Sequence, residues 1–296
     1  MIGSDYINTT QINYSEIIIK TLNDLLFSIF SSIDNSLYSL LDNMAFIDKS
    51  ILSNSLFSKL INSAYGITLL ANSLLVGFAL YYCYRMLLSH FLGNQIEKSY
   101  HFLLKLLVCA ICINSYSSLC EQILNLNSLI SSSILEIGSN LIGTNLSFSS
   151  LITSSNQFIA QTSSTNILSF NGILKSLTTF GLLNLLFSYS IRYILVKVFI
   201  LLGPFALLSL TNQTSIWFFK SWFRNFLSLL LVQSLIAIIF LIIFSFNLSE
   251  NTLLLQISYT SAIFILTKTN NYMKELFGGI STDFNLNITN FKNLLR

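Results

Sequence analysis

The stretch that decides the fold is Tyr193-Ile-Leu-Val-Lys-Val-Phe-Ile-Leu-Leu-Gly-Pro-Phe-Ala-Leu-Leu-Ser-Leu210, which is apolar and holds the only proline of the chain. Proline averages about 5% of residues in ordinary proteins, so a single one in a long chain marks a special position. Inside a helix, proline removes a hydrogen bond to residue i−4 and clashes with the preceding turn, while the adjacent glycine relaxes the backbone. We therefore expect a membrane helix that is bent at Gly203 and Pro204.

An aromatic and basic block and a second apolar run follow this helix. The run extends from Phe226 to Phe246. Aromatic rings gather at the headgroup level of a membrane, and cations face its cytoplasmic surface. The block therefore predicts an interfacial hinge, which could also dock a partner, formed by Trp217, Phe218, Phe219, Lys220, Trp222, Phe223 and Arg224.

The composition is that of a membrane protein. Hydrophobic residues make up 53% of the chain, charged residues 9%, and the mean hydropathy is +0.69, whereas soluble domains contain about 25% charged residues. The net charge of +3 is too small to indicate a nucleic-acid surface. The four cysteines lie in or beside apolar runs, which argues against a disulfide framework. We expect an all-α, multi-pass transmembrane protein.

Five segments fit a spanning helix, which needs about 20 mostly apolar residues. The run 173–190 contains Lys175 and several other polar residues, so we expect it to be interfacial or re-entrant. The distribution of Lys and Arg favours an external N-terminus and a cytoplasmic C-terminus, although six spans with both ends inside also fit. The expected spans are residues 60–82, 102–121, 191–210, 226–246 and the shorter 253–267.

The spans divide the chain into five regions. Apolar residues recur at helical spacing in the N-terminal region, which predicts amphipathic helices that lie on a membrane or partner, or that pack on themselves. The regions are an external amphipathic region (1–59), a first transmembrane hairpin (60–121), a polar external loop with the interfacial segment (122–190), the bent helix, hinge and C-terminal hairpin (191–267), and a basic cytoplasmic tail (268–296).

The sequence contains no pattern typical of an enzyme. His90 and His101 have no carboxylate or further histidine at a metal-binding spacing, and Gly278-Gly279 resembles a helix end more than a phosphate loop. We expect no catalytic activity, metal or cofactor. Within the spans, Lys197 can reach the headgroups with its long stem or face a passage, and Gln233 can bond a neighbouring helix. The candidate passage-facing polar residues are Lys175, Arg192, Lys197 and Gln233.

The region from about residue 190 to 247 resembles a known family. Arg192, the apolar run, Gly203-Pro204-Phe-Ala-Leu-Leu, Phe218-Phe-Lys-Ser-Trp222 and Leu229-Leu-Leu-Val-Gln233 follow one another in this order. The order is similar to the signature region of the TrbL-type subunit of conjugation and type IV secretion machines, the sixth component of the VirB set. The rest of the chain matches that family only in its layout.

This resemblance implies a non-enzymatic subunit in a bacterial inner membrane, at the base of a translocation channel for DNA or protein. Its implied partners are membrane lipids, further copies of itself, ATPases and pilus components, with DNA or protein as transient cargo. A self-contained transporter or small-solute channel is an alternative, and a membrane scaffold without substrate contact is another.

Overall fold

The computed structural model describes residues 18, 21, 25, 35–62, 66–92, 99–160, 170–212, 214–246 and 252–278. Every regular element in these ranges is a helix, as expected for an all-α protein. In chain order the elements are α2 (Asn35–Ala45), α3 (Ser50–Ser53), α4 (Ser55–Asn62), α5 (Ile67–Leu92), α6 (Ser99–Asn114), α7 (Tyr116–Ile142), α8 (Phe148–Ala160), α9 (Phe170–Leu208), the 3-10 turn η1 (Ser209–Thr211), α10 (Ile216–Ser245) and α11 (Thr252–Phe277).

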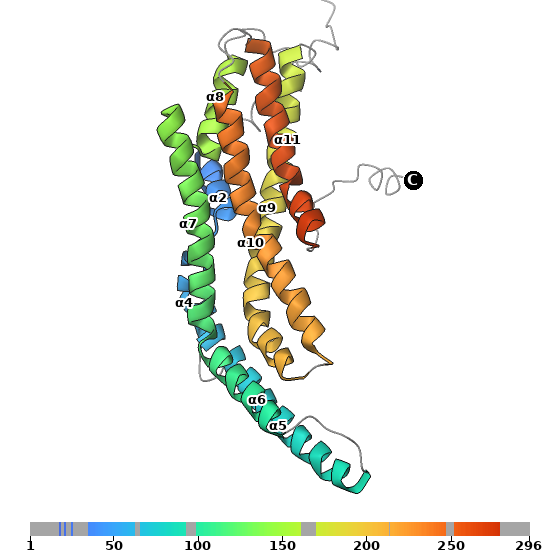
Figure 1. Cartoon of the computed structure of the whole chain (residues 1–296). Coiled ribbons are helices and arrows are strands. Elements are labelled where there is room, and N and C mark those ends of the chain that lie inside the picture. The colour runs from blue at the N-terminus through green and yellow to red at the C-terminus, as the bar shows by residue number, and fades with distance from the viewer. Residues whose placement is uncertain are drawn as a thin grey trace, which may run out of the picture.

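A bundle built around α10 forms the body of the molecule. The helix α10 packs against α7 on one side and against α9 and α11 on the other, while α2 and α8 cover the upper part (Figure 1). The sequence favours this central place, because α10 is apolar on nearly all faces and such a helix must be buried in protein or lipid. Its buried residues include Leu230, Ile236 and Phe240.

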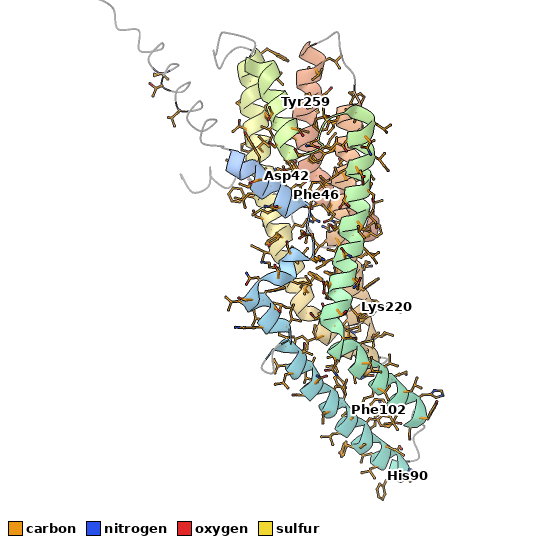
Figure 2. The ribbon with its side chains drawn as sticks, turned by 90° about the vertical axis from the view of Figure 1, so that its left-hand side faces the viewer. Asp42, Phe46, His90, Phe102, Lys220 and Tyr259 are labelled. Carbon is orange, nitrogen blue, oxygen red and sulfur yellow. The ribbon has the colours of Figure 1, made fainter. Side chains whose placement is uncertain are left out.

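The helices α5 and α6 form an arm that projects from the lower end of the bundle, with His90 at its tip (Figure 2). The rings of Tyr82 and Phe102 stack between the two helices with their centroids 3.8 Å apart. Near the base of the arm, Asn72 Nδ2 donates to Asn114 Oδ1 over 3.0 Å. Most of the other apolar side chains of the arm are exposed, which is the pattern of helices that lie in lipid.

Three described helices are long and apolar enough to cross a membrane: Ile67–Phe91, Gly172–Thr211 and Ile216–Ser245. The bent pair Ser99–Asn114 and Tyr116–Ile142 adds a fourth if it is one span. The chain is thus suited to a multi-pass membrane protein, but the five expected spans are not confirmed. The expected fifth span lies in α11, which is not among these helices because many polar residues, such as Thr260 and Lys268, interrupt its apolar sequence.

The helix α9 differs most from the sequence-based expectation. The expected interfacial segment 173–190 and the expected span 191–210 form one continuous helix of 39 residues, about 58 Å long at 1.5 Å per residue. That length is nearly twice the hydrocarbon thickness of a bilayer, about 30 Å. The expected boundary fails because the polar residues around it are buried between helices. Ser188 Oγ, for example, accepts a hydrogen bond from Asn270 Nδ2 over 2.8 Å.

The expected span 102–121 is also different, since the chain bends by 65° between α6 and α7. Asn114 Nδ2 donates to the carbonyl of Ala110 and Ser115 Oγ donates to that of Ile111. Such side-chain bonds compete with the helical backbone bonds and often bend helices. Beyond the bend, α7 runs along α10 to Ile142, so much of the expected polar loop 122–190 is helix packed on the bundle.

Candidate functional site

Gly203 and Pro204 lie near the lower end of α9, where they shape a notch that receives a tyrosine from α7. Because Pro204 has no backbone N–H, the carbonyl of Ile200 lacks its usual donor four residues later. Tyr116 Oη donates to this carbonyl over 2.7 Å. We call Ile200, Gly203 and Pro204 the glycine-proline notch. The phenol of Tyr116 thus satisfies a backbone group that the proline leaves open.

Gly203 is required because the tyrosine ring lies directly against the helix. A Cβ atom at this position would lie 1.9 Å from Tyr116 Oη and 2.1 Å from its Cζ, far inside van der Waals contact. Tyr116 itself is only 3% exposed. The glycine and the proline therefore act together: the glycine opens the space, and the proline frees the carbonyl that holds the ring there.

The notch fixes the place where the arm joins the bundle. Tyr116 is the first residue of α7, directly after the bend at Ser115. On the other side of the bend, Ile113 and Cys109 of α6 pack with Leu208 at the end of α9. The helix α9 continues through Pro204 and ends at Leu208, where the turn η1 begins. The lower end of α9 thus contacts both limbs of the bent pair.

Trp222 makes a second contact with the same turn of α9. Its Nε1 donates to the carbonyl of Phe199 over 2.8 Å, and its ring stacks on Phe226 with centroids 5.4 Å apart. Trp222 is only 6% exposed, so its ring packs between helices, and the expected role at the membrane interface stays a prediction.

The rest of the aromatic and basic block is more accessible than Trp222. Trp217 is 66% and Phe223 43% exposed, Lys220 and Arg224 are exposed, and Phe218 and Phe219 are half-buried. The first turns of α10 therefore have one face that packs on α9 and one face that remains available to lipid or a partner.

A polar layer crosses the bundle above the notch and is centred on Arg192. This side chain has no exposed surface. Its Nε donates to the carbonyl of Leu229 and its Nη1 to that of Ala45, both over 2.8 Å, while Nη2 has no hydrogen-bond partner. Arg192 therefore joins α9, α10 and the end of α2, instead of lining an open passage within this chain.

Gln233 completes the layer. Its Oε1 accepts from the backbone N–H of Ile47 over 2.9 Å, and its Nε2 donates to Ser131 Oγ over 3.1 Å. Like Arg192, Gln233 is fully buried, so it is not exposed to a passage. The two side chains fasten the segment that follows α2 to the helices of the bundle, in agreement with a helix-bonding role for Gln233.

The ammonium group of the half-buried Lys197 lies over two aromatic rings. Its Nζ lies 4.6 Å from the ring centroid of Tyr193 and 5.6 Å from that of Phe57, within cation–π range. The backbone of Lys175 lies in α9, but its side chain is outside the described residues.

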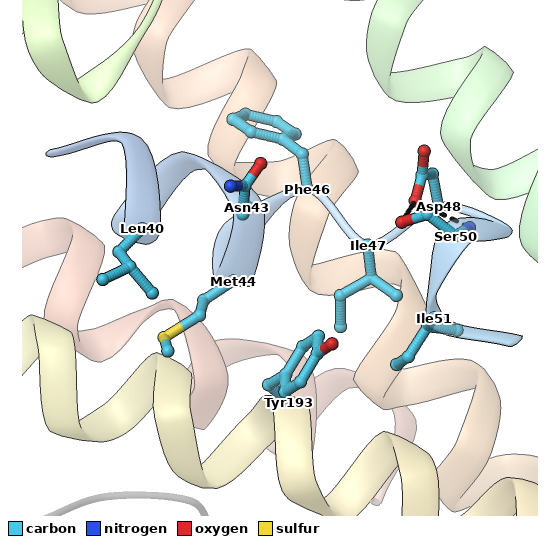
Figure 3. Close-up of a pocket in the computed structure, with 9 residues that line it drawn as sticks. All are labelled: Leu40, Asn43, Met44, Phe46, Ile47, Asp48, Ser50, Ile51 and Tyr193. Atoms are coloured by element: carbon cyan, nitrogen blue, oxygen red, sulfur yellow. Dashed lines mark hydrogen bonds between the residues drawn. The ribbon is translucent and has the colours of Figure 1, made fainter. Parts of the chain in front are cut away.

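A cavity of about 390 Å³ lies beside the polar layer, between α9 and the segment that joins α2 to α3 (Figure 3). Asp48 accepts hydrogen bonds from the backbone N–H and the hydroxyl of Ser50 at its edge. The described residues contain no group of three or more His, Cys, Asp or Glu side chains suited to a metal ion. The lining residues are Leu40, Asn43, Met44, Phe46, Ile47, Asp48, Ser50, Ile51 and Tyr193.

Asp42 lies on α2, the helix that also supplies residues to the cavity wall. It links α2 to α8 (Figure 2). Its Oδ1 accepts from the backbone N–H of Phe148 over 3.0 Å. Burial raises the pKa of the Asp42 carboxyl, and the backbone hydrogen bonds from Phe148 and Ser149 oppose this rise. The folded protein therefore favours the protonated carboxyl more than the unfolded chain does.

No protein-family model matches the chain, and no curated protein matches it. The site is therefore defined by its geometry. The contacts of Gly203, Pro204 and Trp222 lie near the lower end of α9, and those of Arg192 and Gln233 lie above them in the polar layer. Tyr116 is the central residue that sequence reasoning missed. The one available signal was that a proline inside a helix leaves a carbonyl in need of a donor.

Proposed function

We propose that this chain is a non-enzymatic, multi-pass subunit of a TrbL-type conjugation or type IV secretion machine in a bacterial inner membrane. It forms or lines part of the passage for DNA or protein, and partner ATPases supply the energy. Further partners are lipids, pilus components and other copies of the chain.

The observation that carries this proposal is the convergence of the motif residues. The residues that carry the resemblance include Arg192, Gly203, Pro204, Trp222 and Gln233, which are spread over α9 and α10. Each is buried, and each takes part in a contact that positions another helix or segment of the chain. Because the same residues carry the motif and the packing, they form one structural unit, and this supports the resemblance better than the order of the residues does alone.

The attachment of the arm also suits a moving part of a membrane machine. The α5–α6 hairpin projects from the lower end of the bundle, where it contacts α9, η1 and α7 (Figure 1), and Tyr116 anchors the bend from which it projects. A hinge is a small number of positions between rigid elements. The bend at Ser115 and the glycine-proline notch have this arrangement.

Deletion of the gene tests the proposal directly. In a host that carries the chain, deletion should abolish conjugative transfer or secretion, and wild-type chain supplied from a plasmid should restore it. An ATPase and a pilus component should co-purify with the tagged chain. Normal transfer together with loss of uptake of a small solute would instead support a self-contained transporter.

Photo-crosslinking separates a conduit from a scaffold. The polar segment between residues 122 and 190 offers positions such as Asn156 and Asn171, and also Gln161, which lies outside the described residues. Probes there should capture cargo only during active transfer, and a probe at Leu70 on the exposed side of the arm serves as the control. Capture of membrane subunits alone during normal transfer would identify the chain as a scaffold.

A further inference from the structure

The outer face of α7 carries a stripe of polar side chains that no other described helix covers. Its members are exposed and lie within about a third of a turn of one another around the helix axis, at about 3.6 residues per turn. They form two groups, one before and one after the exposed Leu129, and include two carboxylates without any cation on α7. We call this set the α7 polar stripe: Ser118, Glu121, Gln122, Ser133, Glu136 and Asn140.

This stripe cannot face lipid without a large penalty. Uncompensated polar groups and charges are costly in hydrocarbon, and α7 belongs to a bent pair that is apolar enough to cross a membrane. The opposite face of α7 is already occupied, since Asn127 donates to the carbonyl of Leu230 on α10. The polar stripe therefore requires water or a polar partner on the outside of the bundle.

A basic surface lies on the other side of the chain. Arg224 is exposed on α10, on the same helical stripe as Ser228, whose hydroxyl donates to the carbonyl of Met273 on α11. Arg224 therefore points toward the α11 side, away from α7. Lys220 and Lys274 are exposed at this end, and among the residues that the structure describes there, Glu275 is the one exposed acid. We call Lys220, Arg224 and Lys274 the basic surface.

The two surfaces lie at the same level of the bundle. Asn127 of α7 is level with Leu230 of α10, because a hydrogen bond joins them. Glu121 lies as many residues before Asn127 as Arg224 lies before Leu230. Each separation corresponds to about 9 Å along its helix, so Glu121 and Arg224 lie at the same height in the bundle. A neighbouring copy related by rotation about an axis parallel to the bundle would therefore bring Arg224 to the height of Glu121.

We propose that copies of this chain associate head to tail, with the α7 polar stripe of one copy docked on the basic surface of the next. The two surfaces lie on opposite sides of α10, with α7 at one edge of the bundle and α11 at the other (Figure 1). Such heterologous contacts generate a ring when the rotation closes. The exposed apolar residues beside the stripe, such as Leu126 and Ile130, add area to the same contact. The inference rests on the proposed function for its membrane setting, but not for any cargo.

Disulfide trapping in bilayers tests the arrangement of the copies. The full chain with Glu121→Cys and Arg224→Cys, in a Cys83→Ser and Cys112→Ser background, should form a ladder of covalent multimers on oxidation. Each variant with only one of the two added cysteines, in which the buried Cys109 and Cys120 remain, should stay uncrosslinked. A Glu121→Cys variant that forms dimers alone would show a two-fold symmetric contact, and a double variant that stays monomeric would show no contact. Either result overturns the proposal.

Charge exchange tests the complementarity of the surfaces. Glu121→Arg should weaken self-association of the purified full chain at least tenfold, and Arg224→Glu in the same chain should restore it. Glu275→Lys is the matched control: it also replaces an acid with a base, but within the basic surface, so it should not weaken association. All three positions are exposed, and fluorescence of the buried Trp222 checks the fold. Equal weakening by Glu121→Arg and Glu275→Lys, or no rescue, refutes the pairing. If the ladder forms but deletion leaves transfer intact, the inference stands and the proposed function fails.

Discussion

Removal of the Tyr116 hydroxyl should destabilise the protein more when Pro204 is present than when it is replaced. In the native chain the carbonyl of Ile200 accepts from Tyr116 Oη over 2.7 Å and has no helical donor at position 204. Tyr116→Phe leaves this buried carbonyl without either donor. Pro204→Ala supplies a backbone N–H at position 204, so the tyrosine hydroxyl becomes dispensable in that background.

The expected sizes follow from hydrogen-bond energetics. A buried group that loses its partner costs about 1–3 kcal/mol, and hydrogen bonds between membrane helices reach about 1.7 kcal/mol. We therefore expect Tyr116→Phe to lower the free energy of unfolding by about 1.5 kcal/mol in the native background. In the Pro204→Ala background we expect about 0.5 kcal/mol. The coupling energy between the two positions is then about 1 kcal/mol, well above the error for independent sites.

The assay uses tryptophan fluorescence during unfolding in mixed micelles. Trp222 is buried and donates to the carbonyl of Phe199, beside the notch. Replacement of the exposed Trp217 by Phe leaves Trp222 as the single reporter. The same loss of stability from Tyr116→Phe in both backgrounds would refute the idea that the phenol replaces the donor removed by the proline.

The remaining predictions concern the glycine, the carboxyl and the guanidinium of the described sites. Gly203→Ala should force Tyr116 out of the notch, so that thermal stability falls by more than in Tyr116→Phe; equal stability of the two variants would contradict the close contact. For Asp42, the raised pKa in the folded state means that its contribution is present at acid pH and is lost as the pH rises through that pKa. Asp42→Asn keeps the acceptor for Phe148, so it should stabilise the protein at pH 7 relative to wild type and less so at pH 4, and a pH-independent difference in melting temperature would argue against this. Arg192→Leu should release the end of α2, so that limited proteolysis cuts near residue 47 at least tenfold faster, and an unchanged cleavage rate would contradict the anchoring role.

The sequence was sufficient to predict helices and long apolar segments, because composition is a local property. It was not sufficient to divide the spans correctly. Polar residues such as Ser188 and Arg192 look like the end of a membrane segment when hydropathy is averaged along the chain. In the structure they bond neighbouring helices, and the helix continues through them.

The partners of the candidate site were also beyond sequence reasoning. The hydroxyl that bonds Ile200 comes from Tyr116, which lies 84 positions earlier in the chain. No local pattern identifies that tyrosine, since an aromatic residue at the start of a helix has many ordinary roles. Trp222 was expected at the interface for a similar reason: its amphipathic ring suits headgroups, and only the packed helices reveal that its N–H reaches the carbonyl of Phe199.

The anchoring of the segment after α2 has a consequence for biosynthesis. Ala45 and Ile47 leave the ribosome early, yet their partners Arg192 and Gln233 are 147 and 186 positions later in the chain. At translation rates of about 5–20 residues per second, the second partner emerges about 10 to 40 s after Ile47. During this interval the apolar side chains around Ile47 have no docking surface on the bundle. The segment after α2 therefore cannot reach its final position until α10 has been synthesised, and a nascent-chain chaperone or the insertion machinery can protect it during this interval.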